Sequence, residues 1–145
     1  MPQYRKASHV TYDCRYHIIW ITKYRRKILT PQIHQRLKTI IQGITKELYI
    51  NTISLGMEDD HIHLYASIPI TQPIPYVVQK LKGRTSHIIR QEFKTYLKPY
   101  YWKPVLWATG YFVATVGEVS HDIIKNYVDN QGKQDVLGND ETIEL

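Results

Sequence analysis

Residues 61–68 alternate between two kinds of side chain, and this alternation constrains the fold more than any other stretch. Every second residue is apolar, in the order Ile62, Leu64, Ala66, Ile68. Because neighbouring side chains of a strand point to opposite faces, this spacing predicts a strand with one buried face. His61 and His63 fall on the other face, two residues apart, and therefore lie side by side.

Two adjacent imidazoles on a strand are candidate metal ligands. Neutral imidazole is a common ligand of divalent ions, and a strand holds such ligands more rigidly than a loop does. The alternative is a surface strand in which both histidines occur by chance. Asp60 immediately precedes the pair. It is expected either to orient an imidazole or to serve only the turn formed by residues 58–60.

A second candidate segment lies near the end of the chain. Ser120 is a good helix N-cap, and Asp122 favours the first turn of a helix that follows it. On that helix Tyr127 and Gln131 are four residues apart and share a face. A tyrosine is a candidate nucleophile, and a glutamine amide oxygen is a neutral metal ligand. The alternative for Tyr127 is an aromatic side chain that only packs on the sheet.

These two motifs resemble those of the single-tyrosine HUH transposases, the TnpA proteins of small bacterial insertion sequences. The stretches Tyr16–Lys27, Leu81–Ser86 and Leu106–Gly117 are also similar to that family, and the similarity runs from about Ser8 to Gln131. The REP-associated tyrosine transposases resemble the chain at the same motifs.

The resemblance implies a specific chemistry and set of partners. Tyr127 would be the catalytic nucleophile, and His61, His63 and Gln131 would bind Mg²⁺ or Mn²⁺. The activity would be cleavage and rejoining of single-stranded DNA through a covalent 5′-phosphotyrosine intermediate, with recognition of DNA hairpins at the element ends. The active form would be a homodimer.

Composition agrees with a nucleic-acid partner. The chain has 145 residues, a net charge of +6 and a pI near 9.3, which favours an anionic partner. Its length predicts a single domain over residues 1–145, with a polar tail from about 132. The single cysteine, Cys14, excludes an internal disulfide and is typical of a reducing cytoplasm. No apolar run approaches the ~20 residues of a membrane helix, so we expect a cytoplasmic protein without membrane contact.

Two basic stretches are candidate DNA-binding segments. The first surrounds Tyr24 and comprises Lys23, Arg25, Arg26 and Lys27. Positive charges around an aromatic ring suit phosphate contacts and base stacking. The second contains Lys82 and Arg84. The alternative for both is an ordinary solvated basic surface.

The remaining pattern predicts an α+β fold. Apolar periodicity predicts strands at 12–22, 50–57, 61–68 and 107–116, and helices at 31–49, 76–81, 85–97 and from Ser120. Gly83 is expected to separate the second and third helices, and residues 1–9 to be a loosely ordered lead. This order fits a ferredoxin-like antiparallel four-stranded sheet with helices packed on it, plus a C-terminal helix that carries the tyrosine.

Other functions receive less support from the sequence. No serine lies in a nucleophile context, and the acidic run 58–60 is too local for a two-metal nuclease. Two alternatives remain. One is a domesticated relative similar to the REP-associated tyrosine transposases. The other is a non-catalytic nucleic-acid-binding module whose histidines are structural.

Overall fold

The computed structural model describes residues 5–7, 10–12, 14–115 and 125–130. The strands are β1 (Arg5–Ala7), β2 (Val10–Tyr12), β3 (Arg15–Ile21), β4 (Asn51–Met57), β5 (His61–Ser67) and β6 (Phe112–Ala114). The helical elements are the 3-10 turn η1 (Lys23–Arg25), α1 (Pro31–Glu47), α2 (Ile74–Glu92) and α3 (Lys94–Leu97). Residues 125–130 are also helical.

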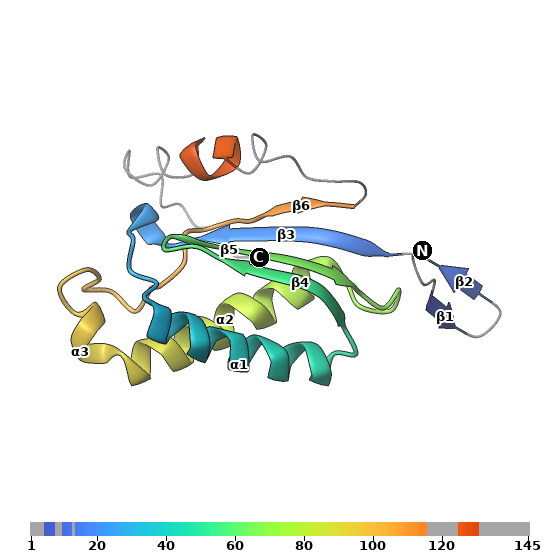
Figure 1. The fold of residues 1–145 in the computed structure, drawn as a ribbon, viewed down its shortest axis with the longest axis horizontal. Helices are drawn as coiled ribbons and strands as arrows, with labels where there is room; N and C mark the ends of the chain where they lie inside the picture. Colours follow the sequence, from blue (N-terminus) through green and yellow to red (C-terminus); the bar gives the residue numbers. More distant parts are fainter. Residues whose placement is uncertain (1–4, 8–9, 13, 116–124, 131–145) are drawn as a thin grey trace.

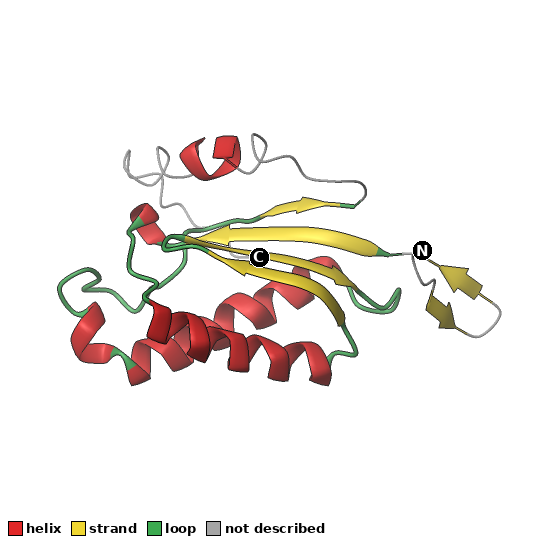
Figure 2. Cartoon of the chain, viewed as in Figure 1, coloured by secondary structure: helices red, strands yellow, loops and turns green. Residues whose placement is uncertain are grey.

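The main sheet has four antiparallel strands in the order β4-β5-β3-β6. Helices α1 and α2 cover one face of this sheet, and the helical segment 125–130 lies on the opposite side (Figure 1). Figure 2, coloured by secondary structure, shows the same arrangement of long helices, sheet and helical segment, with the short β1–β2 hairpin at one end of the molecule. The predicted α+β, ferredoxin-like architecture is therefore confirmed.

The core lies between the sheet and the two long helices. Ile62 and Leu64 of β5 are fully buried there, together with Ile18 and Trp20 of β3. Since burial of a large apolar side chain stabilises a fold by about 1.5–3 kcal/mol, these four residues fix which face of each strand turns inward. The residues between them consequently face the other side of the sheet, as the alternation predicts.

Helix α1 begins where the sequence predicts. The Thr30 hydroxyl accepts a hydrogen bond from the Ile33 backbone N–H at 3.2 Å, and Pro31 occupies the first turn.

The predicted helix break at Gly83 is wrong. A single helix, α2, runs from Ile74 to Glu92. Its buried face continues through Leu81, Thr85 and Ile89, and this packing outweighs the roughly 1 kcal/mol that a glycine costs in a helix. Thr85 is therefore a helix-interior residue. Its hydroxyl donates to the Leu81 carbonyl at 2.6 Å and accepts from Trp107 Nε1 at 2.9 Å.

The last strand is shorter than predicted. Instead of residues 107–116, only Phe112–Ala114 form β6, and Trp107 makes an isolated bridge to Thr22. Gly110 has a φ of +90°, a conformation that interrupts a strand. The Lys82 ammonium donates to the carbonyls of Ala108 and Gly110 at 2.8 and 2.9 Å and so connects this segment to α2. The Ala108 N–H still donates to the Ile21 carbonyl of β3 at 2.9 Å.

Part of the N-terminal lead is ordered, contrary to prediction. Strand β1 pairs with β2, and the Arg5 guanidinium donates to the carbonyls of Ser67 and Tyr49 at 3.1 and 2.8 Å.

None of the helices in the described ranges is long and apolar enough to cross a membrane.

Candidate active site

His61 and His63 lie on the face of β5 that turns away from α1 and α2. Both are half-buried, whereas Ile62 and Leu64 are fully buried on the other face. The pair therefore faces the layer that contains residues 125–130 (Figure 1).

His61 is held by a carboxylate. Its Nδ1 donates to Asp60 Oδ1 at 2.8 Å, and the second oxygen of Asp60 accepts from Arg25 Nε at 3.1 Å. Burial opposes ionisation of Asp60, but the hydrogen bonds from His61 and Arg25 outweigh it and hold the pKa of that carboxyl below its usual value. Asp60 thus orients the His61 ring through Nδ1. Nε2 is the ring nitrogen that Asp60 does not contact, and it is the candidate metal-binding atom.

His63 is held by another imidazole. Its Nε2 and His17 Nδ1 share a hydrogen bond of 3.0 Å, and the His17 ring stacks on Tyr65 with centroids 4.1 Å apart. Burial lowers the pKa of His63, and His17 and His61 lower it further. The neutral form, which can donate a lone pair to a metal, is therefore favoured at neutral pH. His17, on the neighbouring strand β3, thus directly contacts a candidate ligand.

Tyr127 lies on the helical segment that covers this face. Its ring is tilted against Phe112 with centroids 5.8 Å apart, and it packs on a small cluster of Ile21, Ala108 and Val128. Its hydroxyl is buried. The tyrosine is thus close-packed on the sheet in this arrangement, and its role as a nucleophile stays a prediction.

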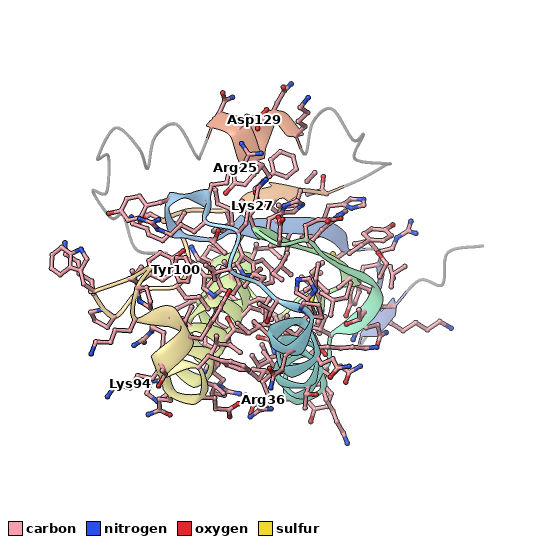
Figure 3. All side chains as sticks on the ribbon, turned by 60° about the vertical axis from the view of Figure 1, so that its left-hand side comes forward. Arg25, Lys27, Arg36, Lys94, Tyr100 and Asp129 are labelled. Atoms are coloured by element: carbon pink, nitrogen blue, oxygen red, sulfur yellow. The ribbon has the colours of Figure 1, made fainter. Side chains whose placement is uncertain are left out.

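Arg25 joins the histidine strand to the tyrosine helix. Besides its bond to Asp60, its guanidinium donates to Asp129 Oδ1 at 2.6 Å. Figure 3 shows Arg25 directed at the segment that carries Asp129. The contacts therefore run from His61 through Asp60 and Arg25 to Asp129, two residues beyond Tyr127. The sequence shows no signal for this connection, because Arg25 and Asp129 are 104 positions apart.

We expect loss of the Arg25–Asp129 pair to loosen the tyrosine helix. Both side chains are more than one third exposed, so the pair contributes about 0.5–1 kcal/mol. The Asp129→Asn substitution should speed amide hydrogen exchange in residues 125–130 about two- to fivefold and leave β5 unchanged. Glu92→Gln, which breaks the similarly exposed Arg36–Glu92 pair, is the matched control. Unchanged exchange at 125–130 would show that the apolar contacts alone hold the helix.

A pocket of about 330 Å³ opens between these elements. It is lined by His61 and the acidic turn, by Arg25 and Lys27, and by Lys125 and Val128 of the tyrosine helix. Lys27 is exposed, so at least one cation is available to a phosphate at this pocket. Segments from the start, middle and end of the chain therefore form one concave site within a single subunit.

The side chains present fit part of a metal site. Two half-buried imidazoles lie on one strand, and one of them is oriented by a carboxylate, as is usual for metal-binding histidines. Within the described ranges, His, Cys, Asp and Glu form no group of three or more that could hold a metal ion. The predicted third ligand, Gln131, lies outside the described residues, as does the predicted helix start at Ser120.

The predicted DNA-binding residues fall into different environments. Lys23 is buried, with 5% of its surface exposed, whereas Arg26 and Lys27 are exposed. Arg84 pairs with Glu47 at 2.7 Å, and Lys82 donates to the two carbonyls described above. Direct DNA contact by all six residues, Arg25 included, stays a prediction.

Comparison with known proteins agrees with this geometry. Residues 10–131 match the family described as IS200-like transposase. The chain is 33% identical over 129 residues to the ISDra2 transposase TnpA of Deinococcus radiodurans, which covers 88% of this chain and 90% of that protein. It is 27% identical over 134 residues to the transposase for insertion sequence element IS200 of Salmonella typhimurium, with coverage of 92% and 87%.

Two solved structures are also similar. A crystal structure of a candidate transposase from Deinococcus radiodurans r1 has a TM-score of 0.80 and 31% identity, and the match covers 88% of this chain and 97% of that one. The structure of a REP-associated tyrosine transposase bound to a REP hairpin has a TM-score of 0.57 and 14% identity, with coverage of 89% and 69%. The second likeness concerns the fold alone. The chain belongs to the family of IS200-like transposases.

Proposed function

We propose that this transposase cleaves and rejoins single-stranded DNA through a covalent 5′-phosphotyrosine intermediate formed by Tyr127. The observation that carries the proposal is the shared pocket, in which His61 and the helix of Tyr127 meet within one chain. Two exposed cations at the same pocket, Lys27 and Lys125, suit the phosphate backbone of the substrate.

The proposed roles follow from the chemistry of the side chains. His61 and His63, with Gln131 as a third ligand outside the described residues, would hold Mg²⁺ or Mn²⁺. When bound, the ion would supply Lewis-acid polarisation of the scissile phosphate oxygens. Asp60 keeps His61 in the tautomer whose Nε2 can act as a ligand. Tyr127 would attack phosphorus and lose its hydroxyl proton to solvent. The bond to the 3′-oxygen of the preceding nucleotide would break, and that oxygen would take up a proton and leave as a 3′-hydroxyl.

This arrangement conserves the energy of the cleaved bond. The phosphotyrosine ester replaces the phosphodiester, so a 3′-hydroxyl can later attack it and restore a phosphodiester without a nucleotide cofactor. Excision of an element needs two cleavages, and each chain supplies one tyrosine nucleophile, Tyr127. We therefore infer that two chains act together as a homodimer.

The DNA partner is proposed to be single-stranded DNA folded into hairpins at the element ends. The REP-associated relative bound to a REP hairpin supports this proposal through its shared fold. The insertion-sequence transposases at 27–33% identity favour a mobile element over a domesticated one.

A covalent-adduct assay tests the proposed reaction. Labelled single-stranded DNA from the flanks of the gene is incubated with the protein and Mg²⁺ or Mn²⁺. We expect a protein–DNA adduct that survives denaturation, that disappears when the metal is chelated, and that does not form on the same sequence as a duplex. Intact hairpin binding without any adduct would instead identify a non-catalytic DNA-binding module.

A further inference from the structure

Trp102 is unusual among the tryptophans of this chain. Its side chain is 86% exposed, whereas Trp20 and Trp107 are buried at 0% and 5%. An exposed indole leaves a large apolar surface in water, and such surfaces commonly mark binding sites. The segment around Trp102 does not line the pocket that contains His61.

Trp102 borders a hollow on the surface. Two pockets of about 690 and 340 Å³ adjoin there, because Tyr101, Trp102, Lys103 and Val105 line both of them. We call this surface the aromatic groove, and define it by Tyr24, Arg26, Lys94, Tyr101, Trp102 and Lys103. Figure 3 shows the neighbouring Tyr100 on the loop after α3, with Lys94 on the same side of the molecule.

The aromatic groove has one sign of charge. The described residues that line the two pockets include no Asp or Glu. They do include a set of long cations: Lys23, Arg26, Arg90, Lys94, Lys98 and Lys103. A concave surface with cations alone favours an anionic ligand.

The cations lie over the faces of the aromatic rings. The Arg26 guanidinium carbon is 5.6 Å from the ring centroid of Tyr24 and 6.0 Å from that of Tyr101. The Lys103 ammonium is 4.9 Å from the Trp102 ring. A ring with a cation over one face can stack a base on its other face, while the cation contacts a phosphate of the same strand.

The walls of the groove are joined before any ligand arrives. The Tyr101 hydroxyl donates to the Lys23 carbonyl at 2.7 Å, and the Lys23 N–H donates to the Leu106 carbonyl at 2.9 Å. The loop after α3 is thereby fixed against residues 23–26. Such preorganisation lowers the entropy lost on binding.

Residues 23–27 form the loop between the aromatic groove and the pocket that contains His61. Lys23, Tyr24 and Arg26 line the aromatic groove, whereas Arg25 and Lys27 line the pocket with His61. A single strand that crosses this loop could therefore occupy both sites at once.

We propose that the aromatic groove binds unpaired nucleotides of single-stranded DNA, with Trp102 stacking on a base and Lys103 and Arg26 contacting phosphates. This inference rests on the proposed function for the choice of DNA, but it requires neither Tyr127 nor a metal. It assigns to Trp102 a role that the sequence does not indicate.

Tryptophan fluorescence tests the proposal, because Trp102 is the exposed indole. The Tyr127→Phe protein is titrated without metal with an oligothymidylate and with an abasic strand of equal length. We expect quenching by the oligothymidylate and little quenching by the abasic strand. Trp102→Phe should abolish the quenching while it retains part of the affinity. Trp102→Ala should weaken binding of the oligothymidylate about tenfold or more.

Tyr76→Ala is the matched control. Tyr76 is 41% exposed with the Lys80 ammonium 5.5 Å from its ring, yet it lines neither pocket of the groove. This variant should bind the oligothymidylate like the parent.

Three outcomes would overturn the proposal. Affinity could be unchanged in Trp102→Ala, or the abasic strand could quench as strongly as the oligothymidylate. Alternatively, Trp102 could become inaccessible to solvent as the protein concentration rises in the absence of DNA, and the resulting dimer could dissociate in Trp102→Ala. That result would show that the groove binds a second copy of the chain. Quenching by the oligothymidylate together with no adduct in the covalent assay would refute the proposed reaction and leave the groove as a DNA-binding site.

Discussion

The Tyr127→Phe variant is expected to form no covalent adduct with single-stranded DNA. Phenylalanine keeps the ring that packs against Phe112 and Ile21 but lacks the oxygen that would attack phosphorus. Loss of a nucleophile in a covalent mechanism should lower the cleavage rate by at least about 10³-fold. The measurement is the labelled-DNA assay, run with wild type and variant at equal concentrations of bound DNA.

Tyr65→Phe is a demanding control for this prediction. Tyr65 lies on the same sheet face as the histidines, and its ring stacks on His17. It is therefore a tyrosine near the candidate metal site that the proposed mechanism does not use. Adduct formation should persist in Tyr65→Phe. If the adduct instead disappeared in Tyr65→Phe and persisted in Tyr127→Phe, the nucleophile would be Tyr65 on β5.

Substitution of both histidines is expected to abolish metal binding and cleavage together. His61→Ala with His63→Ala removes both imidazoles from β5. We expect the affinity for Mn²⁺ to fall more than about 100-fold, since loss of a residue that only orients a ligand already weakens binding 10- to 100-fold. The electron paramagnetic resonance signal of unbound Mn²⁺ measures this directly and does not depend on activity.

His87→Ala serves as the histidine control, because His87 lies on α2, outside the pocket that contains His61. It should bind Mn²⁺ like wild type. Circular dichroism of the double variant should match wild type, because both replaced side chains lie on the outer face of β5 and not in the core. If the double variant bound Mn²⁺ with wild-type affinity, the metal site would lie elsewhere in the protein.

The strands and helices follow from local patterns wherever burial and periodicity agree. The alternation in residues 61–68 predicted β5 and the face on which His61 and His63 lie, because a shift by one residue would take Leu64 out of the core and onto the histidine face. The start of α1 follows from Thr30 and Pro31 in the same local way. The order of the predicted strands and helices then fits a whole ferredoxin-like sheet, as the structure has it.

Local signals failed where a distant contact decides the conformation. Gly83 is a helix breaker by itself, but it remains helical because the buried residues on either side of it pack against the sheet. Residues 107–111 are strand-like in composition, yet Lys82 from α2 holds two of their carbonyls.

The sequence by itself determined the strand that carries the two histidines, the position of a candidate tyrosine in the chain and the basic character of residues 23–27. Only the tertiary structure decided how these parts meet. Arg25, predicted as a DNA contact, bonds to Asp60 and Asp129 because folding brings the helix of Tyr127 over the histidine face. Trp102 similarly joins Arg26 in one groove through the contact of Tyr101 with Lys23. Such long-range pairs leave no periodic trace, since their partners are chosen by the packing of the whole sheet and not by neighbouring residues.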